Sequence, residues 1–369
     1  RRAQGQDKAA SWRIQFFHDE AETEFNIRDL AFPSARRGIA VGSVSSLTRT
    51  KAQPLAVLTS DGGATWSRVK LDDEPVSVFF LNDSEGWMVT QKGIWRTEES
   101  GLSWRRVSKI RGVLRVHFLT RERGWAAGVE KAIYETRDGG NTWTPLPVAS
   151  EPKTTKEFTV YSWIEFANRE QGVITGHSQP PRRERDDRFP DWMDPEGASR
   201  RRQWPTTTVV AQTLDGGETW RSSTTSMFGQ IARLRMTANG AGLALVRFAN
   251  SFEWPSEVFR FNLREDITER VYREKNRSIT DIAVLDDGTA FLAGFEPPGQ
   301  LRQSPIPGKL VVLRSRDMVR WEEMSVDYRA YARRVTLAAV DSNNVWAATD
   351  TGMILKLNAD GANENSSTR

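Results

Sequence analysis

The sequence of 369 residues contains no cysteine. It therefore offers no disulfide bond, no thiolate ligand for a metal ion and no cysteine nucleophile. Histidine is nearly as scarce, because His18, His117 and His177 are the only three, and no two of them have His-x-x-His or His-x-x-x-His spacing. We therefore predict neither a metal site nor a bound cofactor.

Long apolar runs and blocks of one charge are also missing. No stretch approaches the roughly 18 apolar residues that a membrane helix needs, so we predict no transmembrane segment. Lys and Arg number 52 and Asp and Glu number 48, which gives a net charge of +4. The two signs are interspersed, without the basic arm or face that marks nucleic-acid-binding proteins, so we expect no nucleic-acid partner.

Tryptophan, by contrast, is abundant, with 14 residues against five tyrosines. Five of these tryptophans end copies of one pattern, Thr/Ser-x-Asp-x-Gly-x-Thr-Trp. In this corner motif the carboxylate accepts backbone N–H groups, glycine supplies positive φ, and the indole pins the turn onto a sheet. One copy has Glu in place of Asp, and the last copy is one residue short and lacks the glycines. The predicted structural pairs are Asp61 and Trp66, Glu99 and Trp104, Asp138 and Trp143, Asp215 and Trp220, and Asp317 and Trp321.

The stretches between the corners read as short alternating strands, in units of about 40 to 50 residues, which is the size of a propeller blade. Seven units fit, so we predict an all-β, seven-bladed β-propeller of four-stranded antiparallel blades. The last unit stops after its third strand, at residues 353–357, whereas residues 11–17 read as a fourth strand with no unit before it. We therefore predict that the N-terminal strand pairs with the last blade and closes the ring.

The domain boundaries follow from this layout. We expect residues 1–10 to be a flexible segment, residues 11–359 to form a single propeller domain, and residues 360–369 to be a disordered tail. The polar start would suit a mature domain from which a signal peptide has been removed. We expect the protein to be a monomer.

The first strand of each unit alternates strictly, with two apolar columns that we expect to pack between blades. The other two columns should face the central channel. Our alignment takes Arg334 to Leu337 as the first strand of the seventh unit. The two channel columns then contain four arginines and three acids, which leaves one excess positive charge. The channel is thus a predicted site for a small anion or an acidic partner, with Arg115, Arg233 and Arg235 as donors. The alternative is a polar lining that is paired within itself. The candidate channel residues are Asp29, Arg115, His117, Glu165, Arg233, Arg235, Asp281 and Arg334.

Unit four carries one large insertion, residues 180–205, between its second and third strands. Its seven arginines are nearly matched by six acids, with aromatic residues between them. Long loops rich in Trp and Arg often serve in recognition, so Phe189, Trp192 and Trp204 are candidate contacts for a protein partner. The alternative is a solvated surface loop.

The corner motif resembles the Asp-box, or BNR repeat, of sialidases and other propellers. The segment from Gly124-Trp125-Ala126-Ala127-Gly128 to Asp138-Gly139-Gly140-Asn141-Thr142-Trp143 is more specifically similar to the photosystem II assembly and stability factor family, and the resemblance covers about residues 11–360. It implies a seven-bladed propeller of the thylakoid lumen or bacterial periplasm that acts as an assembly scaffold without catalysis. We therefore expect a non-enzymatic extracytoplasmic scaffold, periplasmic or secreted, that binds a protein partner and has no catalytic residues.

A propeller that binds or hydrolyses glycans, with a sialidase-like fold, is the alternative. Its sialidase form has little support, since Arg13-Ile14-Gln15 only echoes the Arg-Ile-Pro of sialidases and no tyrosine has an evident partner Glu. A two-carboxylate glycosidase stays open, because its acid and base can come from different blades about 5 to 10 Å apart.

Overall fold

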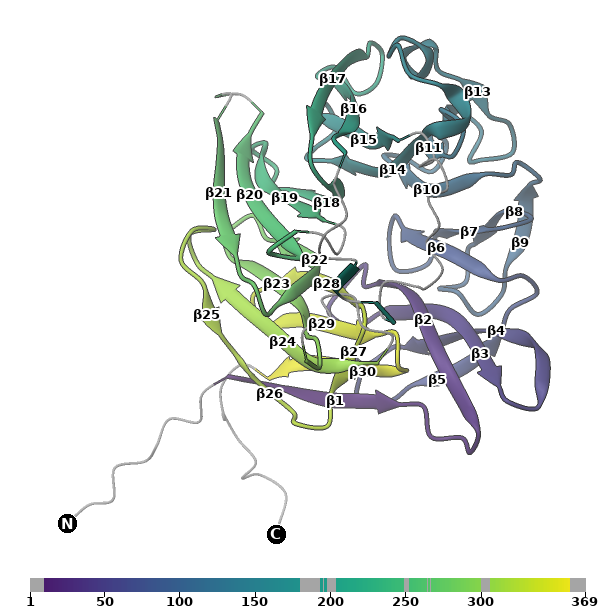
Figure 1. Ribbon diagram of the computed structural model, residues 1–369. Coiled ribbons are helices and arrows are strands. Elements are labelled where there is room, and N and C mark those ends of the chain that lie inside the picture. Colours follow the sequence, from purple (N-terminus) through teal and green to yellow (C-terminus); the bar gives the residue numbers. More distant parts are fainter. Residues whose placement is uncertain are drawn as a thin grey trace.

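A computed structural model describes residues 10–179, 193–194, 196–197, 204–248, 252–263, 265, 267–299 and 306–358. These residues form seven separate sheets, which are arranged as blades around a central opening (Figure 1). Within each sheet, neighbouring strands of the main four are antiparallel and follow one another outward from the centre. The predicted seven-bladed propeller is thus confirmed.

The blades take the strands in chain order. Blade 1 comprises β2 (Thr23–Ala31), β3 (Gly38–Ser46), β4 (Arg49–Thr59) and β5 (Ser67–Lys70). Blade 2 comprises β6 (Pro75–Phe80), β7 (Gly86–Thr90), β8 (Gly93–Thr97) and β9 (Arg105–Ser108). Blade 3 comprises β10 (Val113–Phe118), β11 (Gly124–Gly128), β12 (Ile133–Thr136) and β13 (Thr144–Pro145), and two short 3₁₀ helices, η1 (Pro147–Ser150) and η2 (Lys156–Phe158), lead to the next blade.

The remaining blades continue the order. Blade 4 comprises β14 (Thr159–Phe166), β15 (Gly172–Ser178), β16 (Thr206–Thr213) and β17 (Arg221–Met227). Blade 5 comprises β18 (Gln230–Met236), β19 (Ala241–Arg247), β20 (Ser256–Asn262) and β21 (Ile267–Arg273). Blade 6 comprises β22 (Ser278–Val284), β23 (Ala290–Glu296), β24 (Gly308–Ser315) and β25 (Glu322–Glu323), with β27 (Tyr331–Ala332) also paired to β24.

Blade 7 joins the two ends of the chain. Its inner strands are β28 (Val335–Asp341), β29 (Asn344–Thr349) and β30 (Met353–Asn358), and β1 (Ser11–Phe17) pairs antiparallel with β30. Figure 1 shows the purple β1 beside the yellow β30. The closure predicted from the sequence is therefore present. A short strand from the connection after blade 6, β26 (Ser325–Val326), adds a parallel pairing to the outer side of β1 that the sequence did not suggest.

Tryptophans fill the spaces between blades. Trp87 stacks on Phe118 of blade 3 with ring centroids 3.6 Å apart, and Trp346 stacks on Phe32 of blade 1 at the same distance. The indole of Trp346 also donates a hydrogen bond to the carbonyl oxygen of Gly62 in the corner of blade 1 (3.1 Å). This indole therefore joins apolar burial to a specific contact between neighbouring blades.

The corner motif closes as expected in its three full copies. In the first, Asp61 accepts hydrogen bonds from the backbone N–H and the hydroxyl of Thr65, at 2.9 and 2.6 Å. Asp138 and Asp215 bind Thr142 and Thr219 in the same way. These hydrogen bonds lower the pKa of Asp61 and of Asp215 to about 2, so both carboxylates are charged at neutral pH.

The two variant corners differ in what their acids bind. Glu99 accepts a hydrogen bond from the hydroxyl of Ser103 at 2.7 Å. In the shortened copy, Asp317 accepts the backbone N–H groups of Val319 and Arg320, while Met318 takes the positive φ (59°) that glycine has elsewhere. The shortened corner thus keeps the carboxylate turn without its glycines.

Candidate binding site in the central channel

The innermost strands place a polar layer across the channel. In six of the seven innermost strands, a register shift, or β-bulge, comes just before the residue of the first channel column. The shift lies between Ile27 and Asp29 in β2, for example, and between Ile279 and Asp281 in β22. Asp29 accepts a hydrogen bond from the backbone N–H of Val78 in the next blade (3.0 Å). Asp281 accepts one from Leu337 in the same way (2.9 Å). Each of these acids therefore ties its inner strand to the neighbouring one.

The contact with Leu337 corrects our alignment of the seventh blade by two residues. Leu337 occupies the same place in blade 7 that Val78 occupies in blade 2. The residues on either side of it, Thr336 and Ala338, are therefore the channel positions of β28, and the pairing of Ala338 with Trp346 agrees with this register. Arg334 instead donates hydrogen bonds to the carbonyl oxygens of Ile27 and Arg28 and does not line the cavity of the channel. Its placement in the predicted channel ring was wrong, because β28 has no bulge at this point.

A cavity of about 290 Å³ occupies the channel on the side where the inner strands end. Its walls include one inward residue from every blade. Asp29, Arg115 and Trp163 lie at its deeper side, where the bulged positions meet. The seven wall residues are Ala31, Phe79, His117, Glu165, Arg235, Ala283 and Ala338.

Three of the four predicted arginines lie in the channel ring, and each of them forms an ion pair with a different acid. Arg115 lies 3.1 Å from Asp29, and Arg233 lies 3.2 Å from Asp281. Arg235 lies 3.2 Å from Glu165. The positive excess in our sequence count came from Arg334, which does not line the cavity, and the three remaining arginines match the three acids one to one. The alternative of an internally paired lining describes the observed geometry, and binding of an anion stays a prediction.

Trp163 holds the three guanidinium groups in place. Its ring centroid lies 4.1 Å from the guanidinium of Arg115, 4.7 Å from that of Arg233 and 4.9 Å from that of Arg235. Cations over an indole face are attracted by its electron-rich ring. Our sequence reasoning missed this residue, although Trp163 stands in the same alignment column as Arg115 and Arg233.

Burial sets the protonation states in the channel. It raises the pKa of Glu165, and Arg235 opposes this effect. It lowers the pKa of Arg233 to about 10 against the opposing charge of Asp281, so Arg233 stays protonated at neutral pH. Burial and the charge of Arg235 lower the pKa of His117 to about 3, so this imidazole is neutral. His117 packs between Phe79 and Phe166, with ring centroids 4.8 and 5.0 Å away.

The cavity therefore combines aromatic side chains with the partly exposed guanidinium of Arg235. The side chain of Arg235 is 31% exposed, whereas that of Arg233 is 17% exposed and that of Asp281 is 1% exposed. Of the three predicted donors, Arg235 is thus the one most open to a ligand, and Phe79, which lines the same cavity, is a contact that the sequence analysis did not single out. Among the described residues no cluster of His, Asp and Glu is arranged to hold a metal ion.

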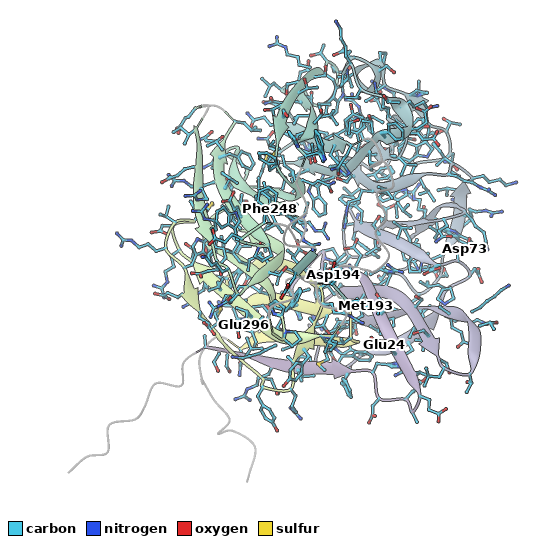
Figure 2. The ribbon with its side chains drawn as sticks, in the orientation of Figure 1. Glu24, Asp73, Met193, Asp194, Phe248 and Glu296 are labelled. Carbon is cyan, nitrogen blue, oxygen red and sulfur yellow. The ribbon has the colours of Figure 1, made fainter. Side chains whose placement is uncertain are left out.

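The predicted insertion site is described only in part. Trp204, just before β16, is 62% exposed, as a recognition residue would be. Phe189 and Trp192 lie outside the described residues. Figure 2 shows Met193 and Asp194 of the insertion against the centre of the ring in this view, rather than beyond its edge.

Comparisons with solved structures support the fold. The chain is similar to YCF48 bound to D1 peptide, with 17% identity, a TM-score of 0.57 and coverage of 95% of this chain and 97% of that one. YCF48 from Cyanidioschyzon merolae gives the same identity and TM-score over 94% and 98%. No protein-family model matches the sequence, and a search of curated proteins finds no significant match.

Propellers with other roles are also similar in fold, at lower identity and over a smaller share of their chains. The GH74 xyloglucanase from Xanthomonas campestris is 11% identical, with a TM-score of 0.51 over 92% of this chain and 58% of that one. The extracellular domain of the one component system BT4673 from B. thetaiotaomicron is 10% identical, with a TM-score of 0.56 over 95% of this chain and 40% of that one. At these identities the likeness defines a seven-bladed propeller similar to YCF48 in fold, and it does not extend to activity. In the part of the chain that the structure describes, no helix is long and apolar enough to cross a membrane.

Proposed function

We propose that this propeller is a non-enzymatic scaffold that binds a segment of a protein partner at the mouth of its central channel. The observation that carries the proposal is the wall of the cavity, which brings Phe79 and neutral His117 together with the partly exposed Arg235 and its buried partner Glu165. An aromatic surface next to a charged donor suits an extended peptide, whose side chain can pack on the ring while its carbonyl or carboxylate binds the guanidinium.

The YCF48 structure with a D1 peptide supports this proposal by analogy, since it is a propeller of the same overall form. Extracellular propeller domains such as that of BT4673 support our expectation that the chain works outside the cytoplasm. Fractionation of the source cells would test the location, and recovery of the protein with cytoplasmic markers would refute it.

A peptide-display selection on the immobilised protein tests the binding function across many peptide sequences at once. We expect selected peptides to lose at least about tenfold in affinity for the charge-balanced variant Arg235→Gln with Glu165→Gln. The matched control is Arg260→Gln with Glu269→Gln, which removes an exposed ion pair of similar length (3.0 Å) on blade 5. Equal loss in both variants, or no loss in the channel variant, would contradict the assignment.

Glycan hydrolysis is the second candidate, because the buried Glu165 has the raised pKa of a general acid. Its geometry is less favourable, since Glu165 and Asp29 are each held by an arginine and Asp29 also accepts a backbone N–H. Incubation with xyloglucan and aryl glycosides decides between the two functions. Release of sugar by the wild type and its loss in Glu165→Gln would establish the hydrolase and overturn the scaffold.

A further inference from the structure

A second polar site lies where the ring closes. In blade 7, Trp346 of β29, Lys356 of β30 and Arg13 of β1 are directly opposite one another across three neighbouring strands. The row faces blade 1, because the indole of Trp346 donates to Gly62 and the ammonium of Lys356 lies 4.9 Å from the centroid of that indole. Two cations therefore stand side by side on one face of the sheet.

Neither cation forms a direct ion pair with an acid among the described residues. Like charges directly opposite each other in a sheet are destabilising unless a counter-charge lies between them. Within the described ranges no carboxylate lies within ion-pair distance of Lys356 or Arg13. Asp61 and Asp341 are near enough to raise the pKa of Lys356, yet burial dominates and lowers it. Both acids are engaged in their own turns, Asp61 by Thr65 and Asp341 by Asn344.

The same row in other blades is neutralised. In blade 2 the row is Trp87, Arg96 and Arg105, and Arg96 lies 3.1 Å from Glu85 and 3.3 Å from Glu98. This arrangement of one tryptophan and two cations is the direct counterpart of blade 7, with the acids added. In blades 3, 5 and 6 the ionisable residue of the third strand also forms an ion pair. These pairs are Glu135 with Arg123 (2.8 Å), Arg260 with Glu269 (3.0 Å) and Arg314 with Glu322 (3.8 Å). Blade 7 thus departs from the pattern of these four blades.

In blade 7 a pocket lies beside the two cations, at the position where blade 2 has Glu85 and Glu98. A pocket of about 380 Å³ lies between β1, β30 and the corner of blade 1. Lys356 and Arg13 line it together with Gln15, Asn343 and Asn358, whose amide groups can donate hydrogen bonds. Asp61 also lines the pocket, with its oxygens turned to Thr65 and Thr59. The pocket therefore brings two cations and several amide donors into one small volume, with the charged carboxylate of Asp61 held in its turn at the wall.

We propose that this closure pocket binds a carboxylate group of a peptide, with Lys356 and Arg13 as the charged donors. The carboxylate takes the place that Glu85 and Glu98 occupy in blade 2. It can belong to an acidic side chain or to a chain terminus, because the donors recognise the same group in both. This site lies at the outer side of the ring and does not depend on the channel function proposed above.

Titration of the full-length protein with three short peptides tests the proposal. The probes are acetyl-Gly-Ser-Gly-Ala with a free carboxyl terminus, the same peptide amidated, and acetyl-Gly-Ser-Gly-Glu amidated. The indole N–H signal of Trp346 in the ¹⁵N-labelled protein reports on the pocket. We expect saturable shifts with one or both acidic peptides and none with the neutral one. The peptide that binds identifies a terminal or a side-chain carboxylate as the preferred source.

Variants then assign the donors. Lys356→Met keeps the stem over Trp346 and removes the charge, and it should weaken binding at least about tenfold. Arg105→Gln changes the matching cation of blade 2 and should leave binding unchanged. If Lys356→Met melts early, Arg13→Gln at the exposed strand gives the second test. Equal binding of the neutral peptide, absence of saturable shifts, or full affinity in folded Lys356→Met and Arg13→Gln would overturn the proposal.

Discussion

Glu99 stands where the four other corners place aspartate. The shorter aspartate reaches both the backbone N–H and the hydroxyl of the residue four positions on, as Asp138 does with Thr142 at 2.9 and 2.6 Å. Among the described contacts, Glu99 reaches only the hydroxyl of Ser103. The extra methylene thus keeps the hydroxyl contact and loses the backbone contact, which leaves a turn N–H to water.

Replacement of Glu99 by Asp should therefore stabilise the protein. One added hydrogen bond to a turn N–H contributes roughly 0.5 to 1.5 kcal/mol to the free energy of unfolding. Chemical denaturation of the wild type and the variant measures the difference. Asp138→Glu is the reciprocal control and should destabilise by a similar amount, so a stabilising effect in both variants would contradict the explanation.

Two junctions between neighbouring innermost strands are held by buried carboxylates rather than by sheet hydrogen bonds. Asp281 of β22 is fully buried and accepts N–H groups from Ile282 and from Leu337 of β28, while Arg233 lies 3.2 Å away. A charged acceptor suits this place because it accepts an N–H group of the next blade and offsets the charge of a buried guanidinium at the same time. Asp29 does the same between β2 and β6.

Asp281→Asn should destabilise the fold much more than a similar change at the surface. Removing one partner of a buried pair leaves the other charge uncompensated, which costs about 3 to 5 kcal/mol. Glu269→Gln, which breaks the exposed pair with Arg260, should change the free energy of unfolding by no more than about 1 kcal/mol. Denaturant unfolding curves for both variants give the comparison. Similar small effects at the two sites would show that Asp281 does not hold the strands together.

The ring as a whole depends on β1. Trp12 is 1% exposed, packs edge-on against Phe291 of blade 6 and donates its indole N–H toward the sulfur of Met324 (3.3 Å). The backbone of β1 also covers the outer edge of β30, which would otherwise be an exposed strand edge. One short segment thus fills a core between blades 6 and 7 and completes a sheet.

Deletion of residues 1–17 should abolish cooperative unfolding or cause aggregation, because it empties the Trp12 site and exposes β30. Calorimetry and size-exclusion chromatography measure these effects. A synthetic peptide with the sequence of residues 10–19, added in excess, should restore a cooperative transition, and the same peptide with Trp12 replaced by Ala should not. A truncated protein that unfolds cooperatively at the wild-type temperature would contradict closure by this strand.

The sequence by itself determined the blade number, the corners and the closing strand, because each of these has a local signature. Asp, Gly and Trp at fixed spacing report a turn, and alternation reports a strand with one buried face. Ser11–Phe17 carried such a pattern without a unit before it, while the last unit lacked a strand. These features depend on neighbours in the chain, so they are visible without a structure.

The tertiary structure alone decided which polar residues meet. A slip of two residues keeps every side chain on its face, so alternation in β28 fitted both Arg334–Leu337 and the observed Thr336–Ala339. The contact of Asp281 with Leu337 selected between them, and it joins residues 56 positions apart. The pairing of Arg235 with Glu165 and the facing of Lys356 and Arg13 likewise arise between distant segments. The paired charges in the channel and the two neighbouring cations at the closure are therefore properties of the packed ring, because they depend on distances that no local pattern records.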